Sequence, residues 1–191
     1  MNKATLLTTT FYRNASDIRF HLACQMVGNA MAMGHWVVIV DGSPDPEIRK
    51  AFEKIGACVY KQVSSGMGAS RRELFKIGAR FDSDLFVWLE PEKVDLVRWI
   101  SIIVSRLRNG ESEVVIPERT EVGWNSYPAP QVKSEKMAND VFRDMTGNSL
   151  DVMFGPVAFH RKAMSIFIEC NPKERFDVPD EYIQQTAVMI A

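Results

Sequence analysis

The stretch "DLFVWLEPEKVDLV", Asp84 to Val97, joins a buried strand to a helix and decides the fold. Its apolar run ends at Glu90, Pro91 follows, and Glu92 stands two positions after the first glutamate. A continuous apolar run is typical of a strand that helices cover on both faces, as in the parallel sheet of an α/β protein. Two interpretations of the glutamates follow: they hold a metal ion, or they help to start the next helix.

The same alternation of strand and helix extends on both sides of this stretch. Apolar runs predict strands at residues 4–11, 35–42, 57–63, 84–90 and 112–119. Helices are predicted from an N-cap at Ser16 to Gly34, from an N-cap at Asp45 to Gly56, and over residues 71–81 and 95–110. This order predicts one α/β domain, a three-layer α/β/α sandwich around a mainly parallel, Rossmann-like sheet.

The pattern changes after Arg119. Residues 120–131 are rich in proline, glycine and aromatic side chains and predict a loop, and residues 134–147 predict a helix. Residues 151–164 predict one or two short strands that run into a helix at about Arg161. The apolar helical pattern at the C-terminus predicts packing against the body or against a second copy, which would form a homo-oligomer, unless the sequence is truncated there.

Composition excludes several classes of protein. The chain has 191 residues, a formal net charge of −1 and no long basic run, so nothing indicates a nucleic-acid partner. No apolar stretch approaches the roughly 20 residues of a membrane span, and the N-terminus is too polar for a secretory signal. Its three cysteines are widely spaced without a CxxC pair, which favours reduced thiols over disulfides or zinc. We therefore expect a cytoplasmic protein.

Polar residues gather where the predicted strands end, and in open α/β sheets ligands bind beyond those ends. Asp41, directly after a strand, either accepts hydrogen bonds from a ribose or base, or simply forms a turn. "SGMGASRR", residues 65–72, opens a helix, where glycines and free N–H groups favour phosphate. Arg71 and Arg72 would be unfavourable against the positive end of that helix unless a diphosphate were bound there.

The glutamates of the opening stretch allow two outcomes. If the chain stays extended through Glu92, Glu90 and Glu92 point to the same side and suit a hard divalent cation. If Pro91 instead starts a helix, Glu92 and Asp95 face its positive end and stabilise it. A candidate phosphate loop and a candidate ribose carboxylate at the same edge favour the metal interpretation.

The order of these motifs resembles the GT-A fold nucleotide-diphospho-sugar transferases, especially family-2-like glycosyltransferases. The resemblance covers "LLTTTFYRN", "VVIVDGSPD", "GMGASRR", "FVWLEPEK" and "FGPVAFHRKAM", roughly residues 4–165. It implies a nucleotide-binding half, 1–119, and an acceptor-side half, 120–191, of one domain. It also implies binding of a nucleoside-diphosphate sugar, with Mn²⁺ or Mg²⁺ as cofactor. The residues it implies for the substrate are Thr8, Thr9, Asp41, Gly66, Gly68 and Arg71.

The family's DxD metal motif falls on Glu90 and Glu92, where longer side chains and an intervening proline depart from the pattern. His160 is a further candidate contact for the metal or for a phosphate, although a lone histidine is more often structural. Asp180 or Glu181 would be the catalytic base of an inverting enzyme, or else a cap of the last helix. Trp124 belongs to an aromatic loop that either stacks on a sugar or acceptor or packs as a lid.

The leading hypothesis for function is a small glycosyltransferase with an unidentified acceptor. A catalytically inactive nucleotide-sugar-binding or regulatory protein is the alternative, which the Glu-Pro-Glu departure favours. A nucleotidyltransferase is a third hypothesis. It would place a glycine-rich loop directly after the first strand, and "TTTFYRN" contains no glycine.

Overall fold

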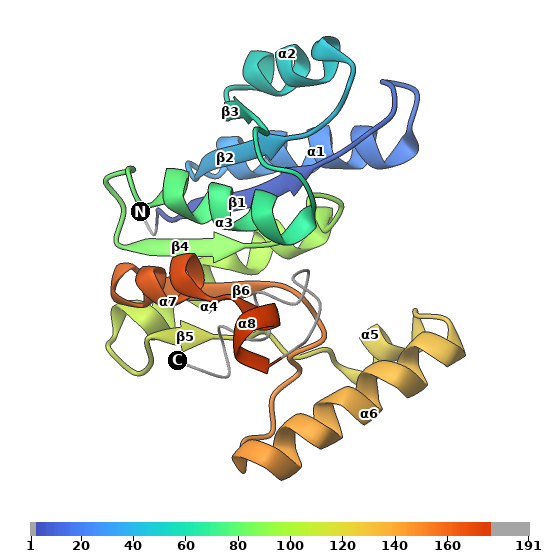
Figure 1. Ribbon diagram of the computed structural model, residues 1–191, viewed down its shortest axis with the longest axis vertical. Coiled ribbons are helices and arrows are strands. Elements are labelled where there is room, and N and C mark those ends of the chain that lie inside the picture. The colour runs from blue at the N-terminus through green and yellow to red at the C-terminus, as the bar shows by residue number, and fades with distance from the viewer. Residues whose placement is uncertain (1–2, 177–191) are drawn as a thin grey trace.

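The computed structural model describes residues 3–176 and contains a six-stranded sheet built from the apolar runs of the sequence (Figure 1). Its order is β3-β2-β1-β4-β6-β5. The first four strands are parallel, β6 runs antiparallel to β4, and β5 runs antiparallel to β6, which confirms a mainly parallel sheet. The strands are β1 (Thr5–Thr10), β2 (Trp36–Asp41), β3 (Cys58–Lys61), β4 (Leu85–Trp88), β5 (Val114–Val115) and β6 (Val157–His160).

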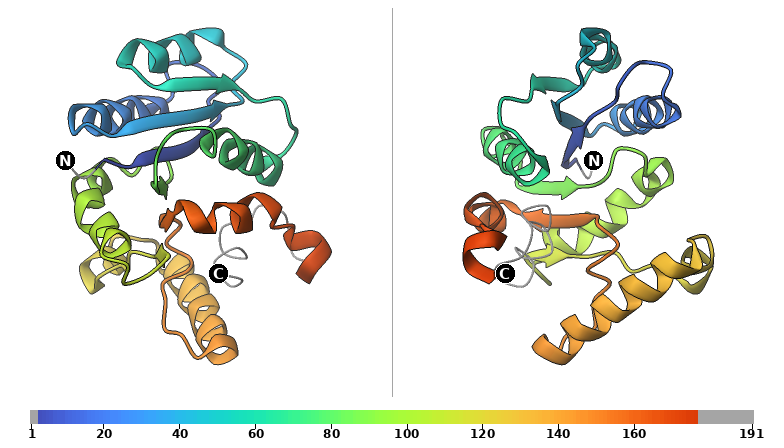
Figure 2. Two further views of the ribbon diagram at one scale, coloured as in Figure 1. Left: turned by 90° about the vertical axis from the view of Figure 1, so that its left-hand side faces the viewer. Right: turned by 45° about the vertical axis from the view of Figure 1, so that its right-hand side comes forward.

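Helices cover both faces of the sheet and bury one core on each side, as Figures 1 and 2 show. One face carries α1 (Ile18–Ala32), α2 (Pro46–Ile55), the 3₁₀ helix η1 (Val94–Trp99) and α4 (Ile100–Arg108). The other carries α3 (Met67–Gly78), the 3₁₀ turn η2 (Arg161–Ala163) and α7 (Met164–Glu169), after which α8 (Pro172–Phe176) follows. The predicted three-layer sandwich is thus confirmed.

Local caps explain where the first helices begin and end. Asp45 accepts a hydrogen bond from the Glu47 N–H at 2.9 Å, and Gly56 ends α2 with a φ of 109°, as predicted. The N-cap of α1 is Asp17 rather than the predicted Ser16, because the Asp17 carboxylate accepts from the Arg19 N–H.

Four further predicted boundaries were wrong. Helix α3 begins at Met67, four residues before the predicted start, and the predicted strand over 112–119 shrinks to the two residues of β5. The predicted loop over 120–131 contains the helix α5 (Glu121–Asn125), because Thr120 caps it by accepting from the Gly123 N–H at 3.3 Å. Helix α6 (Ala129–Thr146) therefore also starts earlier than expected.

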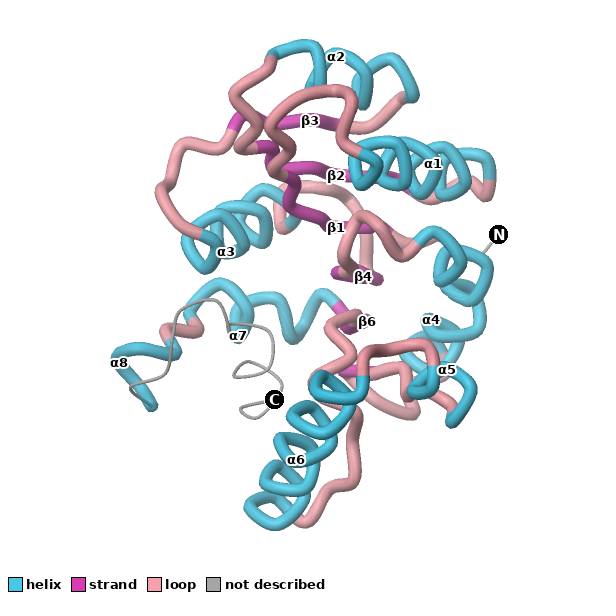
Figure 3. Tube along the Cα trace, turned by 90° about the vertical axis from the view of Figure 1, so that its right-hand side faces the viewer, coloured by secondary structure: helices cyan, strands magenta, loops and turns pink. Residues whose placement is uncertain are grey.

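Residues 120–150, here called the arm, project from the body, and α6 extends outward in Figure 3. Phe142 is the one residue of α6 that the described structure buries. The arm is held at its base by Arg119, whose guanidinium donates to both carboxylate oxygens of Asp151 at 2.7 Å and also to Glu135. The Trp124 ring stacks on this guanidinium, with its centroid 3.6 Å from Cζ. A buried charged cluster thus joins the arm to the sheet.

Among residues 3–176, no helix combines the length and the apolar character needed to cross a membrane. The predicted packing of the C-terminal apolar pattern falls on residues outside that range.

Candidate functional site

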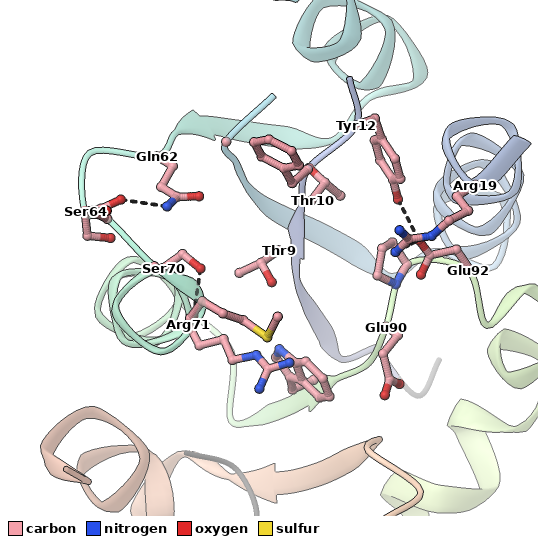
Figure 4. Close-up of a pocket in the computed structure, with 17 residues that line it drawn as sticks. Thr9, Thr10, Tyr12, Arg19, Gln62, Ser64, Ser70, Arg71, Glu90 and Glu92 are labelled. Atoms are coloured by element: carbon pink, nitrogen blue, oxygen red, sulfur yellow. Dashed lines mark hydrogen bonds and ion pairs between the residues drawn. The ribbon is translucent and has the colours of Figure 1, made fainter. Parts of the chain in front are cut away.

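A pocket of about 740 Å³ lies at the carboxyl ends of the parallel strands. Strands β2 and β3 lie on one side of β1, and β4 lies on the other, so the connections diverge between β1 and β4. Such a divergence leaves a crevice in which open α/β sheets bind ligands. The pocket is lined by Thr9, Thr10, Phe11, Tyr12, Arg19, Gly42, Gln62, Ser64, Ser65, Gly66, Met67, Ser70, Arg71, Trp88, Glu90, Pro91 and Glu92 (Figure 4).

One end of the pocket presents an aromatic ring and an amide. Phe11 directly follows β1 and is 62% exposed, and Gln62 directly follows β3. The Gln62 Nε2 donates to the Ser64 carbonyl at 2.6 Å, which fixes the amide. A Cβ on Gly42 would lie 2.4 Å from the Gln62 Oε1, so a larger residue there would displace the Gln62 amide. Phe11 and Gln62 were not predicted as site residues, because they fall inside the last residues of the predicted strands 4–11 and 57–63.

The middle of the pocket is formed by the start of α3. Gly66 caps this helix with a φ of 91°, a left-handed conformation that favours glycine. The Glu73 carboxylate accepts hydrogen bonds from the backbone and the hydroxyl of Ser64, at 3.1 and 2.7 Å, which fixes the preceding loop. One turn into the helix, the Arg71 guanidinium lies 4.9 Å from the Trp88 ring centroid. Backbone N–H groups and a guanidinium therefore face the same space.

Glu90 lies at the other end, on the segment after β4. Its Oε2 is buried, accepts no hydrogen bond from the described residues, and lies 3.9 Å from the Lys93 ammonium. The carboxylate rests on Gly155, because a Cβ at that position would be 2.0 Å from the Glu90 Oε1. Burial raises the pKa of Glu90, although the positive charges of Lys93 and Arg71 oppose this shift.

Glu92 turns away from Glu90, as Figure 4 shows. The Lys93 N–H donates to the Glu90 carbonyl at 3.1 Å and closes a turn through Pro91 and Glu92. The Glu92 Oε1 accepts from the Tyr12 hydroxyl at 3.2 Å and pairs with Arg19 at 2.8 Å. The chain is therefore not extended through Glu92, so the basis for predicting two carboxylates on one side was wrong. Neither does Pro91 start a helix, since η1 begins at Val94.

Five of the predicted site residues line this one pocket: Thr9, Gly66, Arg71, Glu90 and Glu92. Thr8 is fully buried within β1, and Gly68 is buried inside α3. Asp41 is also fully buried. Its carboxylate accepts from the hydroxyls of Thr10 and Ser43 at 2.8 and 2.6 Å and pairs with Arg49 at 3.0 Å. Other side chains of the protein thus bind this carboxylate, which does not face the pocket.

Two further predicted site residues, His160 and Trp124, do not line the pocket. His160 pairs with Leu85, the first residue of β4, because β6 runs antiparallel to β4. It therefore lies at the opposite end of the strands from the pocket. Its Nδ1 accepts from the Lys162 N–H at 3.3 Å and caps η2. Trp124 stacks on Arg119 in the arm. Asp180 and Glu181 lie outside the described residues. Within residues 3–176, no three His, Cys, Asp or Glu side chains gather as a metal cluster.

No protein-family model matches the sequence, and neither does any curated protein. Solved structures of glucosyl-3-phosphoglycerate synthase from Mycobacterium tuberculosis share its fold. One of these, in complex with Mn²⁺, UDP-glucose and phosphoglyceric acid, has a TM-score of 0.56 and 17% identity over 84% of this chain and 57% of its own. Another, in complex with Mg²⁺ and UDP, has a TM-score of 0.58 and 16% identity over 91% and 66%.

At such identities these structures establish the fold alone, and this chain spans 57% of the length of the first. The fold is that of the GT-A nucleotide-diphospho-sugar transferases, which confirms the predicted fold.

Replacing Glu90 with glutamine should raise the melting temperature near neutral pH, because the neutral amide avoids the cost of burying a charge. The folded protein holds the Glu90 proton more tightly than the unfolded chain does, since burial raises the pKa of this carboxyl. Wild-type stability should therefore fall as the pH rises from the ordinary glutamate range through the raised pKa. The gain from glutamine should grow over the same range.

Thermal melting of both proteins in a series of buffers from about pH 4 to 7 measures this difference. Glu92→Gln is the control, and it should lower the melting temperature by weakening the contacts with Arg19 and Tyr12. A wild-type protein that melts above Glu90→Gln at every pH would contradict the expected cost of this charge.

Proposed function

We propose that this chain is a glycosyltransferase that takes a sugar from a nucleoside-diphosphate sugar and transfers it to an acceptor, with a divalent metal ion. The observation that carries the proposal is the order of chemistry along one pocket. An exposed aromatic ring and a fixed amide stand at one end, an open helix N-terminus and Arg71 in the middle, and Glu90 at the other end. The base, the diphosphate and the cation of such a substrate follow one another in the same order.

Each part of the substrate has a partner of matching chemistry. The Phe11 ring offers a surface on which a base stacks, and the Gln62 amide offers hydrogen bonds to its edge. The N–H groups after Gly66 and the Arg71 guanidinium would hold the diphosphate, whose negative charge they match. Thr9, between these groups, faces the sugar part of the nucleotide in this arrangement.

The residues present fit a divalent cation with one protein carboxylate. Mg²⁺ and Mn²⁺ at phosphate sites bind one or two carboxylates and complete their shell with phosphate oxygens and water. Glu90 has a buried oxygen without a hydrogen bond from the described residues, which suits a ligand. Glu92 is already paired with Arg19 and would act only in the outer shell. When bound, the ion would stabilise the negative charge on the leaving diphosphate.

The solved structures that share the fold support this choice, because they hold Mn²⁺ or Mg²⁺ together with UDP or UDP-glucose. The half formed by residues 1–119 would then bind the nucleotide, and residues 120–191 would face the acceptor. We propose Asp180 or Glu181 as the catalytic base. We also propose that the protein is located in the cytoplasm.

One experiment separates turnover from binding. Purified protein is incubated with UDP-glucose or GDP-mannose and Mn²⁺, and release of UDP or GDP is followed, alongside calorimetric titration with each nucleotide. Release that requires both Mn²⁺ and protein supports the transferase. Binding without any release would favour the second candidate, a nucleotide-sugar-binding protein. The pairing of Glu92 with Arg19 favours this candidate, because it engages one of the two glutamates of the predicted metal motif. Absence of both binding and release would reject the proposed function.

Phe11→Ala should weaken nucleotide binding about fivefold, since loss of an aromatic stack costs on the order of 1 kcal/mol. Trp36→Ala is the matched control, because Trp36 is similarly exposed at 52% but is the first residue of β2, at the end of the strands away from the pocket. Titration of UDP and GDP into each variant checks this. Equal affinities in the two variants would remove Phe11 from the site.

A further inference from the structure

Lys93 is held against Glu90 but is not itself among the residues that line the pocket. Its Nζ lies 3.9 Å from the Glu90 Oε2, 3.3 Å from the Tyr127 hydroxyl and 4.4 Å from the centroid of the Phe154 ring. The Lys93 side chain is 21% exposed. Tyr127 belongs to the arm and Phe154 follows it, so two aromatic side chains fix this ammonium beside the carboxylate.

The contact between Lys93 and Glu90 is electrostatic and not a hydrogen bond, because 3.9 Å is too long for one. The Glu90 Oε2 accepts no hydrogen bond from the described residues, and the carboxylate is pressed against Gly155. The ammonium is therefore the close counter-charge of this partly buried carboxylate. Partly buried charges are screened weakly by salt, so the interaction persists at ordinary ionic strength.

A divalent cation on the same carboxylate would meet the repulsion of that ammonium. Removing the repulsion requires either that Lys93 moves, against its contacts with Tyr127 and Phe154, or that negative charge arrives nearby. A diphosphate brings such charge to the neighbouring N-terminus of α3. The nucleotide would then increase the affinity for the cation, and the cation would increase the affinity for the nucleotide by the same factor, because such coupling is reciprocal.

We propose that Lys93 competes with a divalent cation for the Glu90 carboxylate and so makes cation binding depend on a nucleoside diphosphate. The proposal rests on the proposed function in one respect, that Glu90 is the cation's ligand. It adds an order of events, in which the metal ion enters with the nucleotide and the empty pocket resists it.

The test measures Mn²⁺ binding, by electron paramagnetic resonance of the free ion, with and without UDP. Lys93→Met should bind Mn²⁺ alone roughly tenfold more tightly than the wild type, because a unit charge several ångströms away has been removed. UDP should increase Mn²⁺ affinity strongly in the wild type and much less in Lys93→Met. Lys93→Arg keeps the charge and should behave as the wild type does.

Lys162→Met is the matched control, because the Lys162 Nζ also lies 3.9 Å from a glutamate oxygen, that of Glu113, but on the exposed surface. It should leave both affinities unchanged. Lys93→Gln gives a second uncharged variant if Lys93→Met fails to fold.

Two failures can be told apart. If Lys93→Met and Lys93→Gln bind Mn²⁺ alone no more tightly than the wild type, competition by Lys93 is overturned. If Glu90→Gln leaves Mn²⁺ binding intact in the presence of UDP, Glu90 is not the ligand, and the metal part of the proposed function falls.

Discussion

Replacing Arg119 with methionine is expected to lower the free energy of unfolding by about 3–5 kcal/mol, since one partner of a buried ion pair is removed. The side chains of Arg119 and Asp151 are each 3% exposed, and Asp151 would be left as a buried charge without its guanidinium. Glu135 and the stacked Trp124 ring would lose the same partner. The variant should therefore release the arm from the sheet.

The effect should also depend on pH. Burial by itself would raise the pKa of Asp151, but hydrogen bonds from Arg119 and Asn139 lower it overall. A lowered pKa means that this carboxylate stabilises the fold above the ordinary aspartate range, and that the contribution is lost as the pH falls through the lowered value. The difference between wild type and Arg119→Met should shrink accordingly at acid pH.

Urea denaturation at several pH values measures both effects. Arg143→Met is the matched control on α6, because Arg143 is 49% exposed and pairs with Asp140 at 2.7 Å on the surface. Surface pairs contribute about 1 kcal/mol or less, so this variant should barely change. A similar small change in Arg119→Met would show that the buried cluster does not anchor the arm.

In the proposed glycosyltransferase reaction, replacing Glu90 with glutamine should lower the rate roughly a hundredfold or more, since a metal ion contributes several kcal/mol to stabilising charge in the transition state. The amide keeps the shape of the side chain and removes the charge that would hold the ion. The same variant is expected to melt at a higher temperature than the wild type. A gain in stability with a loss of activity would be the signature of a charge kept for function.

Glu92→Gln serves as the control for activity, because its carboxylate is bound to Arg19 and Tyr12 and not directed at the same point. Its transfer rate should fall by much less than that of Glu90→Gln. Rates are measured as UDP or GDP release at saturating Mn²⁺. Equal losses in the two variants would indicate a shared site and contradict the separate roles.

The alternation of strands and helices up to Arg108 could be predicted because local signals agree there. Apolar runs, the cap at Asp45 and the glycine at Gly56 all indicate the same boundaries. The remainder depends on pairing between distant segments. The antiparallel direction of β6 follows from its pairing with β4, which no local pattern encodes. Strand β5 has only two residues and is too short to show a periodicity in the sequence.

Five of the residues that line the pocket could be predicted, because the carboxyl ends of parallel strands lie side by side. The sequence pattern could not show which of these polar side chains would pair with other side chains of the protein. Asp41 and Glu92 stand at the expected positions, yet Arg49 and Arg19, from helices α2 and α1, pair with them. Such contacts depend on helix packing, which no spacing within a strand reveals.

Gly155 links two positions that are far apart in the sequence. Its φ of 97° and the missing β-carbon leave room in which the Glu90 carboxylate lies. A side chain at position 155 would occupy that room, and a glutamate at position 90 would have to turn elsewhere. Related sequences should therefore vary at both positions together: those that keep glutamate at 90 should keep glycine at 155, and those that lose one are free to lose the other.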